Sequence, residues 1–481
     1  MTGRAPLLLV CITVVLGGCA VGPDFGRPPA PPVDRYTADP ARVTLAPGGD
    51  EPAQRLVVGH AISAQWWELF GSRPLVDAVD LALAGSPTLA AAEATLAQGE
   101  EAVTVARAAF YPHVDLTGSA TRQHRSSSAE GGGGGTFNLF SLGPSVSYSP
   151  DVFGGTRRHV EQAGAQAESQ RDELAAAYLA LTGNVVSQAI AVAGARLEIG
   201  AAEEIIADDE RNLDLVRAKL DAGKAAETDV LTAESQLATD QAQLPPLLQQ
   251  LSAARDAFAV LVGRFPAEWS PPDFDLVDLT LPGELPLSIP SELVRQRPDI
   301  LAAEATLHAA SAAVGVATAN LYPSFTLSAS VAQEALDTGT LFTSSGTVWS
   351  LASGVTAPVF EGGALRAARR GAVDAYDAAF ATYRQTVLQA FGQVADVLQA
   401  LGHDADLVAG QRRALDVADR SRALQRISYG EGKSDLLRLL DAERLYQQAR
   451  LGYARAEAQR HQDTAALFVA MGGGWWERGK L

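Results

Sequence analysis

The sequence predicts a mainly α-helical fold that combines long helical hairpins with a smaller β part of four strands. Two long stretches, residues 151–244 and 359–481, contain no proline. Because proline breaks helix interiors, its absence permits very long helices. Four short segments alternate apolar with small or polar residues, which is the period-2 pattern of β-strands. The whole arrangement occurs twice along the chain, which indicates a duplicated, domain-sized unit.

The composition favours thin helical packing over several thick cores. Of the 481 residues 47% are hydrophobic but only 6% are aromatic, and alanine supplies much of the apolar share, as in 174–192. The net charge of −18 leaves no excess of Lys and Arg for phosphates, so a nucleic-acid partner is excluded. An acidic surface fits a cation-preferring lumen, but solvated helix faces give the same balance and are the simpler explanation.

Residues 1–18 resemble a lipoprotein signal peptide. Arg4 precedes an apolar run at 7–15 that is too short to span a bilayer, and the sequence Leu-Gly-Gly-Cys then ends at Cys19. This lipobox-like sequence predicts acylation of Cys19; an ordinary signal peptide with an incidental cysteine is the alternative. Cys11 would leave with the signal, so the mature chain would have no thiol for a disulfide, a metal or a nucleophile.

Proline also marks the segments outside the helices. Nine of the 25 prolines precede residue 60, so 19–60 is expected to be an extended tether behind the lipid anchor. Ala20 rather than aspartate follows the cysteine, which resembles lipoproteins sent to the outer membrane. Nine more prolines lie between Pro245 and Pro298 and predict a connector. Residues 61–481 would form the main body, with no helical membrane span after residue 19.

The two halves of the chain repeat one another. One copy opens with SPTLAAAEATL at 86–96, and the other opens with RPDILAAEATL at 297–307, 211 residues later. Later landmarks drift only slightly, since Gly223-Lys224 recurs as Gly432-Lys433, 209 residues later. A drift this small across a whole half makes chance similarity a poor explanation. The two repeats are expected to span about 75–262 and about 290–471.

Each copy has the same predicted order of elements. A helix of moderate length comes first, over about 87–110 and about 298–321, and a Tyr-Pro pair ends it. Strand-like segments follow at 114–121, 140–148, 325–331 and 348–355. The glycine-rich stretch between the first two strands predicts a surface loop, and no Lys-Ser or Lys-Thr closes it as a phosphate site requires.

A long antiparallel hairpin completes each copy. The first predicted helix runs over 156–222 to the turn at Gly223, and the second runs over 364–429 to the turn near Gly432. A helix of this length reaches about 100 Å at 1.5 Å per residue. Returning helices are expected to about Val262 and about Met471.

The four strands cannot close a membrane barrel alone. Segments of about eight to ten residues suffice for a tilted bilayer crossing, but unpaired sheet edges are costly in hydrocarbon. Two chains would give eight strands with a filled interior, and three would give twelve with room for a lumen. A solute channel favours three, although other counts stay open, and a small soluble sheet is the alternative.

These features resemble the TolC family of outer-membrane efflux proteins, and most closely its lipoprotein branch of the OprM and NodT type. The likeness rests on the lipobox, on the sequence WWELF at 66–70 and on the helix start at 86–87. Two strand-to-helix junctions, DVFGG at 151–155 and PVFEGG at 358–363, also match. The likeness covers nearly the whole chain from Cys19, in family order.

The resemblance implies a homotrimer with one shared 12-stranded β-barrel and a long α-helical tunnel across the periplasm. It implies docking to a periplasmic adaptor protein and to an inner-membrane transporter of the resistance-nodulation-division (RND) class. The subunit would be a passive, gated export duct for drugs or other small molecules, lipid-anchored in the outer membrane and extending into the periplasm. The family has no catalysis of its own, so we expect no enzyme activity, no metal and no cofactor beyond the lipid on Cys19.

The resemblance also places a periplasmic gate at the two hairpin turns. Asp229 resembles a family tip aspartate, while Tyr429 and Asp441 match a family tyrosine and an aperture aspartate. Arg438 stands where some members carry a second aspartate, which puts a double acidic ring in doubt. We expect Arg438 to pair with Asp229 or Asp441 between neighbouring hairpins and to hold the tip shut. A solvated helix charge is the alternative for each residue.

Two other functions fit the sequence less well than a channel. A lipid-anchored periplasmic adaptor is the closest alternative, but adaptors have one helical hairpin flanked by soluble β domains, whereas this chain predicts two hairpins and few strands. A hydrolase has no support, since the seven histidines are scattered and neither His-Glu-x-x-His nor Gly-x-Ser-x-Gly occurs.

Overall fold

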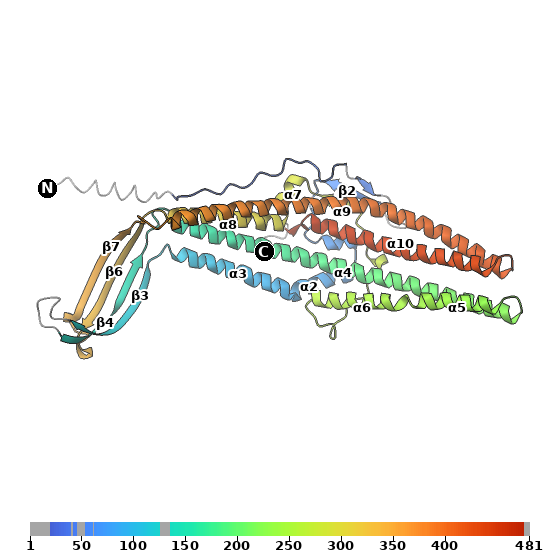
Figure 1. Ribbon diagram of the computed structural model, residues 1–481, viewed down its shortest axis with the longest axis horizontal. Coiled ribbons are helices and arrows are strands. Elements are labelled where there is room, and N and C mark those ends of the chain that lie inside the picture. The colour runs from blue at the N-terminus through green and yellow to red at the C-terminus, as the bar shows by residue number, and fades with distance from the viewer. Residues whose placement is uncertain (1–19, 40–41, 46–52, 61, 126–134, 476–481) are drawn as a thin grey trace. The chain divides into compact units, whose positions relative to one another are not determined.

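The computed structural model of the chain describes residues 20–39, 42–45, 53–60, 62–125 and 135–475 (Figure 1). The predicted signal peptide, Cys19 and most of the glycine-rich loop lie outside these residues. The chain forms two compact units. The first contains the described part of Met1–Pro28 with Thr95–Arg171 and Ala302–Arg384; the second contains the described parts of Pro29–Ala94, Asp172–Leu301 and Gln385–Leu481.

One series of elements occurs twice along the chain. A helix of 22 residues, two antiparallel strands and a helix of 67 residues follow one another in the same order each time. The first series is α3 (Pro87–Ala108), β3 (His113–Arg125), β4 (Gly135–Tyr148) and α4 (Gly155–Asp221). The second is α8 (Pro298–Ala319), β6 (Ser324–Ala335), β7 (Thr347–Thr356) and α9 (Ala364–Gly430). The Tyr-Pro pairs end α3 and α8, as expected from the loss of a backbone donor.

The first unit contains a four-stranded antiparallel sheet of order β3-β4-β6-β7. Its register places Val114 opposite Val146, Val146 opposite Ala329, and Ala329 opposite Leu351. The strands are 10 to 14 residues long, so the expected eight to ten residues were too few. Among the described residues β3 and β7 each pair on one side only, which leaves the sheet with two open edges.

The two faces of this sheet differ in chemistry. Because side chains alternate across a strand, the register assigns every residue to a face. One face is mostly apolar and carries Val114, Leu116, Phe140, Leu142, Val146, Tyr148, Phe325, Leu327, Val331, Trp349, Leu351 and Val355. Polar residues on this face, including Arg122, Asn138 and Gln333, lie toward the end that carries the β3–β4 and β6–β7 connections. The other face is mostly polar or small and carries Asp115, Thr117, Ser119, Ser141, Ser145, Ser147, Thr326, Ser328, Ser330 and Ser350. Its larger apolar residues, Phe137, Leu139 and Val348, lie toward the end of the sheet that carries the β3–β4 and β6–β7 connections. Trp349 and Leu351 are 73% and 77% exposed, so the apolar face lacks a covering layer within the chain.

The segment directly after Cys19 packs within the first unit. The guanidinium of Arg158 on α4 donates to the carbonyl of Val21 at 3.2 Å and to the carboxylate of Asp24 at 2.6 Å. The ring of Phe25 stacks on His308 of α8 at a centroid distance of 4.4 Å. The start of the predicted tether is therefore held against two helices.

The second unit contains a small sheet that the sequence analysis missed. It has the order β1-β2-β5, made by Thr44–Leu45, Gln54–Val58 and Glu284–Leu287, with β2 antiparallel to β1 and parallel to β5. The short helices beside it in sequence are η1 (Trp66–Phe70), α2 (Arg73–Gly85), η2 (Leu276–Asp278) and α7 (Pro290–Gln296). The segments predicted as tether and connector thus contain strands and helices, because proline at a strand edge or in a first helical turn does not prevent them.

Two helical hairpins make up most of the second unit. Hairpin 1 is α4 with α5 (Glu227–Gln241) and α6 (Leu244–Leu261); hairpin 2 is α9 with α10 (Leu436–Ala470). The returning arm of hairpin 1 was predicted as one helix but breaks at Ala242 and Gln243, directly before two prolines in the first turn of α6. The returning arm of hairpin 2 has no proline and continues over 35 residues.

Two helices of the described chain, α4 and α8, are long and apolar enough to cross a membrane, and α2 with α3 would qualify as one bent pair. Length and composition alone therefore do not support the expectation of no helical span after residue 19. Alanine is the physical reason, since it counts as apolar yet keeps a helix thin enough to pack on its neighbours. In α4, 61% of the most apolar 18-residue segment is buried inside the protein.

Candidate gate at the hairpin turns

Both hairpins turn through the same backbone motif. After α4, Gly223 has a φ of 70° and the N–H of Lys224 donates to the carbonyl of Lys219 at 2.8 Å. After α9, Gly432 has a φ of 73° and Lys433 makes the corresponding bond at 2.8 Å. This combination is a Schellman motif, which favours glycine because an L side chain is strained at positive φ.

The two returning helices are capped by carboxylates at different positions. In hairpin 1 the N-cap is Ala226, which has no side-chain acceptor, and Asp229 three residues later accepts from the Ala226 N–H at 2.9 Å. In hairpin 2 the N-cap itself is Asp435, whose carboxylate accepts from the N–H of Arg438 at 2.9 Å. Asp229 and Arg438 occupy equivalent third positions, so Asp435 explains why Arg438 can stand where a capping acid is expected.

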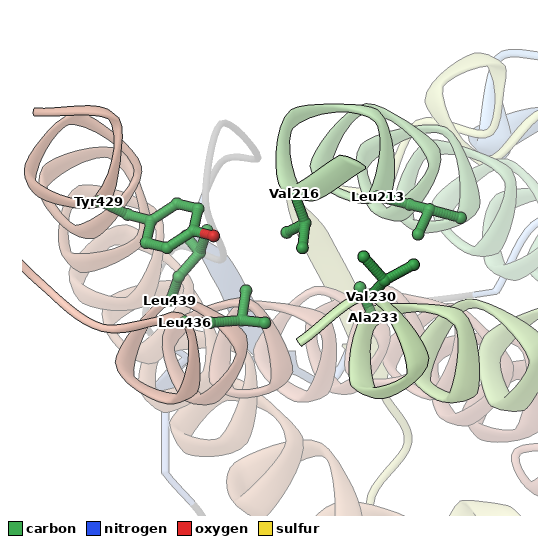
Figure 2. Packing of buried hydrophobic residues seen from close by; sticks show 7 residues of the cluster. All are labelled: Leu213, Val216, Val230, Ala233, Tyr429, Leu436 and Leu439. Carbon is green, nitrogen blue, oxygen red and sulfur yellow. The ribbon is translucent and has the colours of Figure 1, made fainter. Parts of the chain in front are cut away.

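Tyr429 lies in a buried apolar cluster that joins the two hairpins near their turns. The cluster contains Leu213, Val216, Val230, Ala233, Tyr429, Leu436 and Leu439, from α4, α5, α9 and α10 (Figure 2). The ammonium of Lys219 lies 3.4 Å from the centroid of the Tyr429 ring and also donates to the Tyr429 carbonyl. Burial lowers the pKa of Lys219, and burial together with the negative charge of Asp229 raises the pKa of Tyr429.

Arg438 and Asp441 are exposed on the first turns of α10. Within this chain the Arg438 guanidinium lies 3.7 Å from Asp435, and Asp441 pairs with Arg444 at 2.7 Å. The side chains of Arg438 and Asp441 are 72% and 63% exposed. The expected pairing of Arg438 with Asp229 or Asp441 is not found inside one chain, and a pairing across a chain boundary stays a prediction.

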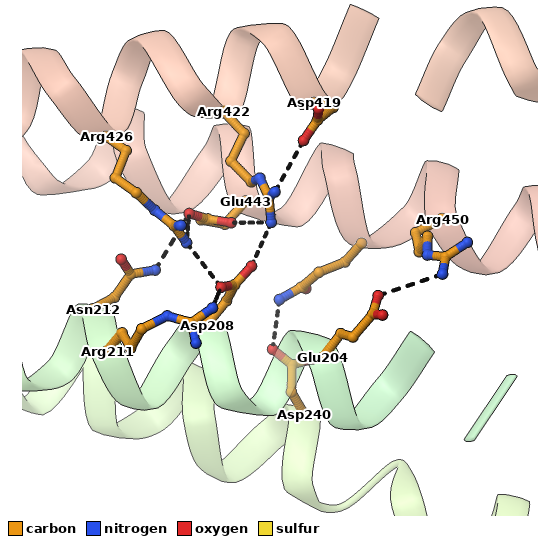
Figure 3. Close-up of polar contacts among 11 residues, drawn as sticks. Glu204, Asp208, Arg211, Asn212, Asp240, Asp419, Arg422, Arg426, Glu443 and Arg450 are labelled. Carbon is orange, nitrogen blue, oxygen red and sulfur yellow. Dashed lines mark hydrogen bonds and ion pairs between the residues drawn. The ribbon is translucent and has the colours of Figure 1, made fainter. Parts of the chain in front are cut away.

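A larger ion-pair network lies further from the turns, and it joins α4 to α9 and α10 (Figure 3). Asp208 of α4 pairs with Arg422 of α9 and lies 3.3 Å from Arg426, also of α9. Arg426 lies 3.0 Å from Glu443 of α10, and Asn212 donates to the same carboxylate at 3.4 Å. The side chains of Glu443 and Asp208 are only 2% and 11% exposed, so little water screens this network.

Burial and the neighbouring charges act on this network in opposite directions. Burial raises the pKa of Glu443, although Arg426, Asn212 and Arg422 all favour its ionised form. Burial also opposes the charge on Arg426, but Glu443 and Asp208 more than offset it and raise the pKa of the guanidinium. The ionised form of Glu443 is stabilised by Arg426, and the charge of Arg426 is stabilised by Glu443 and Asp208. Because these residues come from both hairpins, the network stabilises the packing of one hairpin on the other.

Sequence reasoning found the turns but missed most of what surrounds them. Lys219, Arg422 and Arg426 look like solvated helix charges in the sequence, and no local signal separates them from their exposed neighbours. Their partners are more than 200 residues away in most cases, so only packing brings them together. In the described part of the chain no three or more His, Cys, Asp or Glu side chains are grouped to hold a metal ion.

Comparison with known proteins identifies the family. Residues 78–264 and 289–473 match the outer membrane efflux protein family. The chain is 31% identical over 476 residues to the pyoverdine export outer membrane protein OpmQ of Pseudomonas aeruginosa, covering 98% of this chain and 97% of that protein. It is 29% identical over 480 residues to nodulation protein T of Rhizobium leguminosarum bv. viciae, covering 98% and 93%. The chain belongs to the outer membrane efflux protein family, which confirms the resemblance to TolC-type proteins.

Solved channel structures share this fold. The outer-membrane channel OprN matches with a TM-score of 0.87 and 30% identity over 95% of this chain and all of that one. The open state of the MtrE outer membrane channel of Neisseria gonorrhoeae matches with a TM-score of 0.83 and 25% identity, over 95% and 99%. The mainly helical fold with a β part is confirmed. The protein is an outer-membrane channel subunit of the efflux class, and its family and neighbours are channels rather than enzymes.

Proposed function

We propose that three copies of this chain form one export duct, in which their sheets close a 12-stranded barrel. The observation that supports this proposal is the four-stranded sheet with one apolar face, one polar face and two open edges. Pairing β7 of one copy with β3 of the next removes the open edges, directs the apolar face to lipid and directs the serine-rich face to a lumen.

Two adjacent residues of β7 test the assignment of the faces. Leu351 is on the apolar face and Ser350 is on the polar face. Leu351→Arg places a charge in lipid, at a cost of about 2–4 kcal/mol near the bilayer midplane, and should reduce the heat-modifiable trimer in outer membranes. Ser350→Arg should leave the trimer intact. Equal loss with both variants, or migration as a monomer in the unheated wild type, would contradict the proposal.

We also infer that residues 1–18 are a cleaved signal peptide and that Cys19 carries the lipid. The support is the Leu-Gly-Gly-Cys sequence after a short apolar run. Residues 19–60 would follow as the lipidated N-terminal segment, and 61–481 as the channel with its two repeats. Labelling with a palmitate analogue should mark the wild type and spare Cys19→Ala; a labelled Cys19→Ala chain would show that the lipid is elsewhere.

The channel is proposed to work with a periplasmic adaptor protein and an RND-type inner-membrane transporter. The support is its similarity to efflux-pump subunits, such as the toluene efflux pump outer membrane protein TtgF of Pseudomonas putida, at 28% identity. The hairpin turns would contact the adaptor. A photo-crosslinking residue at exposed Lys433 should capture a co-expressed adaptor, whereas one at exposed Thr340, between β6 and β7, should not. Capture from Thr340 alone would place the adaptor elsewhere.

The gate is proposed to lie at the hairpin turns, with Asp229, Tyr429, Arg438 and Asp441 on its inner side. The support is that exposed Arg438 and Asp441 are available to a neighbouring chain, while Tyr429 and Lys219 hold the hairpins of one chain together. In planar bilayers Arg438→Ala should raise the closed-state current of the trimer. Lys433→Ala removes the same charge from the turn itself and should change the current little. An unchanged current with Arg438→Ala would remove Arg438 from the gate.

A further inference from the structure

Asp209 of α4 is a buried carboxyl group without a hydrogen-bond donor. It is 3% exposed, and in the described part of the chain no donor reaches either of its two oxygens. An ionised carboxylate here has lost its hydrogen bonds to water and makes none to the protein. A neutral carboxylic acid has a much smaller free energy cost of burial. The surroundings of Asp209 therefore favour the protonated form.

Asp240 of α5 lies next to Asp209 and has the opposite surroundings. It is 4% exposed, and its carboxylate accepts from the side-chain amides of Gln236 at 2.7 Å, Gln243 at 2.8 Å and Gln447 at 3.1 Å. Three amide donors therefore satisfy the oxygens of Asp240, whereas those of Asp209 have none. Because two neighbouring carboxylates cannot both be ionised cheaply, a proton on Asp209 can be donated to Asp240 and shared by the pair.

The charged groups around Asp209 and Asp240 also favour a proton on Asp209. Burial, the contact with Asp240 and the negative charges of Glu443 and Asp208 all raise the pKa of Asp209, to about 8. The cations from α9, Arg422 and Arg426, are occupied by Asp208 and Glu443.

Hairpin 2 holds a second pair of the same kind. Asp404 of α9 is 7% exposed, and among the described residues no donor reaches its Oδ2 atom. Its neighbour is Asp463 of α10, which accepts from Gln459 at 2.9 Å. Burial and Asp463 raise the pKa of Asp404 to about 7, against the opposing effect of Arg460.

We propose that each hairpin binds one proton between two aspartates, one from its outgoing helix and one from its returning helix, and that helix packing depends on these protons. The pairs are Asp209 with Asp240 in hairpin 1 and Asp404 with Asp463 in hairpin 2. Loss of the proton leaves two facing carboxylates, which repel and loosen the hairpin. Asp209 is 14 residues before Gly223, so the loosening in hairpin 1 occurs about 21 Å along α4 from the turn.

The direction of the pH effect follows from linkage. Folding raises the pKa of Asp209, so the folded chain keeps a proton that the unfolded chain has lost. The contribution of Asp209 to stability is largest below the ordinary carboxyl pKa of about 4, falls as the pH rises, and stops falling above about 8. Across that window the loss of the Asp209 proton alone should raise the unfolding equilibrium constant by up to about tenfold for each pH unit.

The test uses Asp209→Asn, which keeps the shape of the protonated acid and replaces its O–H donor with an amide N–H at every pH. Relative to the wild type, this variant should gain resistance to denaturant steadily from pH 5 to pH 8, because it has no proton to lose. Asp214→Asn, on an exposed position of the same helix, should follow the wild type. A wild type and an Asp209→Asn variant with parallel pH profiles would overturn the proposal.

Infrared spectroscopy gives a second test that needs no folding equilibrium. The wild-type trimer at pH 6 should show a protonated carboxyl band that shifts in heavy water and disappears above pH 9. The band should be weaker in Asp209→Asn and in Asp404→Asn, and absent in the double variant. A missing band in the wild type would overturn the proposal. Stabilisation of the wild type by Mg²⁺ would also overturn the proposal if Asp209→Asn abolished it. A divalent cation, not a proton, would then lie between the two carboxylates.

Discussion

The two hairpins contain the same ion pair in different surroundings. Arg217 and Glu234 join α4 to α5 in hairpin 1 at 2.8 Å, and Arg426 and Glu443 join α9 to α10 in hairpin 2 at 3.0 Å, 209 residues further along. In hairpin 1 both side chains are about half exposed, at 52% and 42%, whereas Glu443 is 2% exposed. The pair is repeated, but packing of one hairpin on the other buried only the second copy.

Asp208 is the residue that makes the second copy different. It comes from hairpin 1 and reaches Arg422 and Arg426 of hairpin 2, so hairpin 1 supplies an acid and hairpin 2 supplies two cations. The two hairpins therefore differ although they arise from a repeated sequence. The ion pairs between them form because hairpin 1 has an acid where hairpin 2 has cations to receive it. Four predictions test this comparison, in order of decreasing effect.

The largest effect is expected at the buried copy of the ion pair. Glu443→Ala removes the 2% exposed carboxylate from the network, leaves the 34% exposed Arg426 with Asp208 alone, and should cost about 3–5 kcal/mol of unfolding free energy. Glu234→Ala removes the exposed equivalent and should cost less than about 1 kcal/mol. Denaturant unfolding followed by circular dichroism measures both. Similar losses at the two sites would show that burial does not separate the two copies.

The second prediction concerns the break in the returning arm. Ala454 in the interior of α10 is equivalent in the repeat to Pro245 of α6 and is 1% exposed. Ala454→Pro removes a helical hydrogen bond and should cost about 3 kcal/mol or more. Pro245→Ala should change stability by less than about 1 kcal/mol, because a proline in a first helical turn breaks no bond. Tolerance of Ala454→Pro would mean that the α10 arm need not be continuous.

The third prediction concerns the turn glycines, which have the same conformation in both hairpins. Gly223→Ala and Gly432→Ala each force an L side chain into the left-handed region and should each cost about 1–2 kcal/mol. No atom lies within 4 Å of a Cβ added at either glycine, so backbone conformation alone should set the cost. The two losses should agree closely in thermal unfolding, and a large difference would show that the turns are not equivalent.

The smallest effects are expected at the caps. Asp435→Ala removes the N-cap carboxylate of α10 and should cost about 1 kcal/mol. Ala226→Asp introduces the missing N-cap acceptor in hairpin 1 and should stabilise α5 by roughly 0.5–1 kcal/mol. Thermal unfolding of the two variants should therefore shift in opposite directions. A loss of stability with Ala226→Asp would mean that repulsion from Glu227 and Asp229 outweighs the new cap.

Much of the fold could be predicted from local signals. The proline-free stretches predicted α4 and α9 to within about one residue at each end, and Gly223 and Gly432 marked the turns. The alternating segments predicted all four strands but shortened them, because residues at strand ends, such as Ser324 and Thr347, carry no strong apolar signal. Pro245 was expected to begin the proline-rich connector, but it lies in the first turn of α6, inside the returning helix that was expected to run to about Val262.

The candidate gate could be predicted only in part. The resemblance to a known family pointed to Asp229, Tyr429, Arg438 and Asp441, but it gave Asp229 a gating role without its capping role. Asp435 explains the substitution at Arg438, and an acid just after a turn could have been recognised as an N-cap in the sequence.

The sequence by itself determined the repeated order of helices and strands, the sites of the turns and the alternation of the sheet faces. These features depend on backbone restrictions and on periodicity, which act over a few residues. Only the tertiary structure decided that Glu443 is buried while Glu234 is exposed, that Lys219 lies on Tyr429, and that Asp209 faces Asp240. The physical reason is that burial depends on which helices pack side by side, and the same ion pair at equivalent positions of two repeats does not determine that packing.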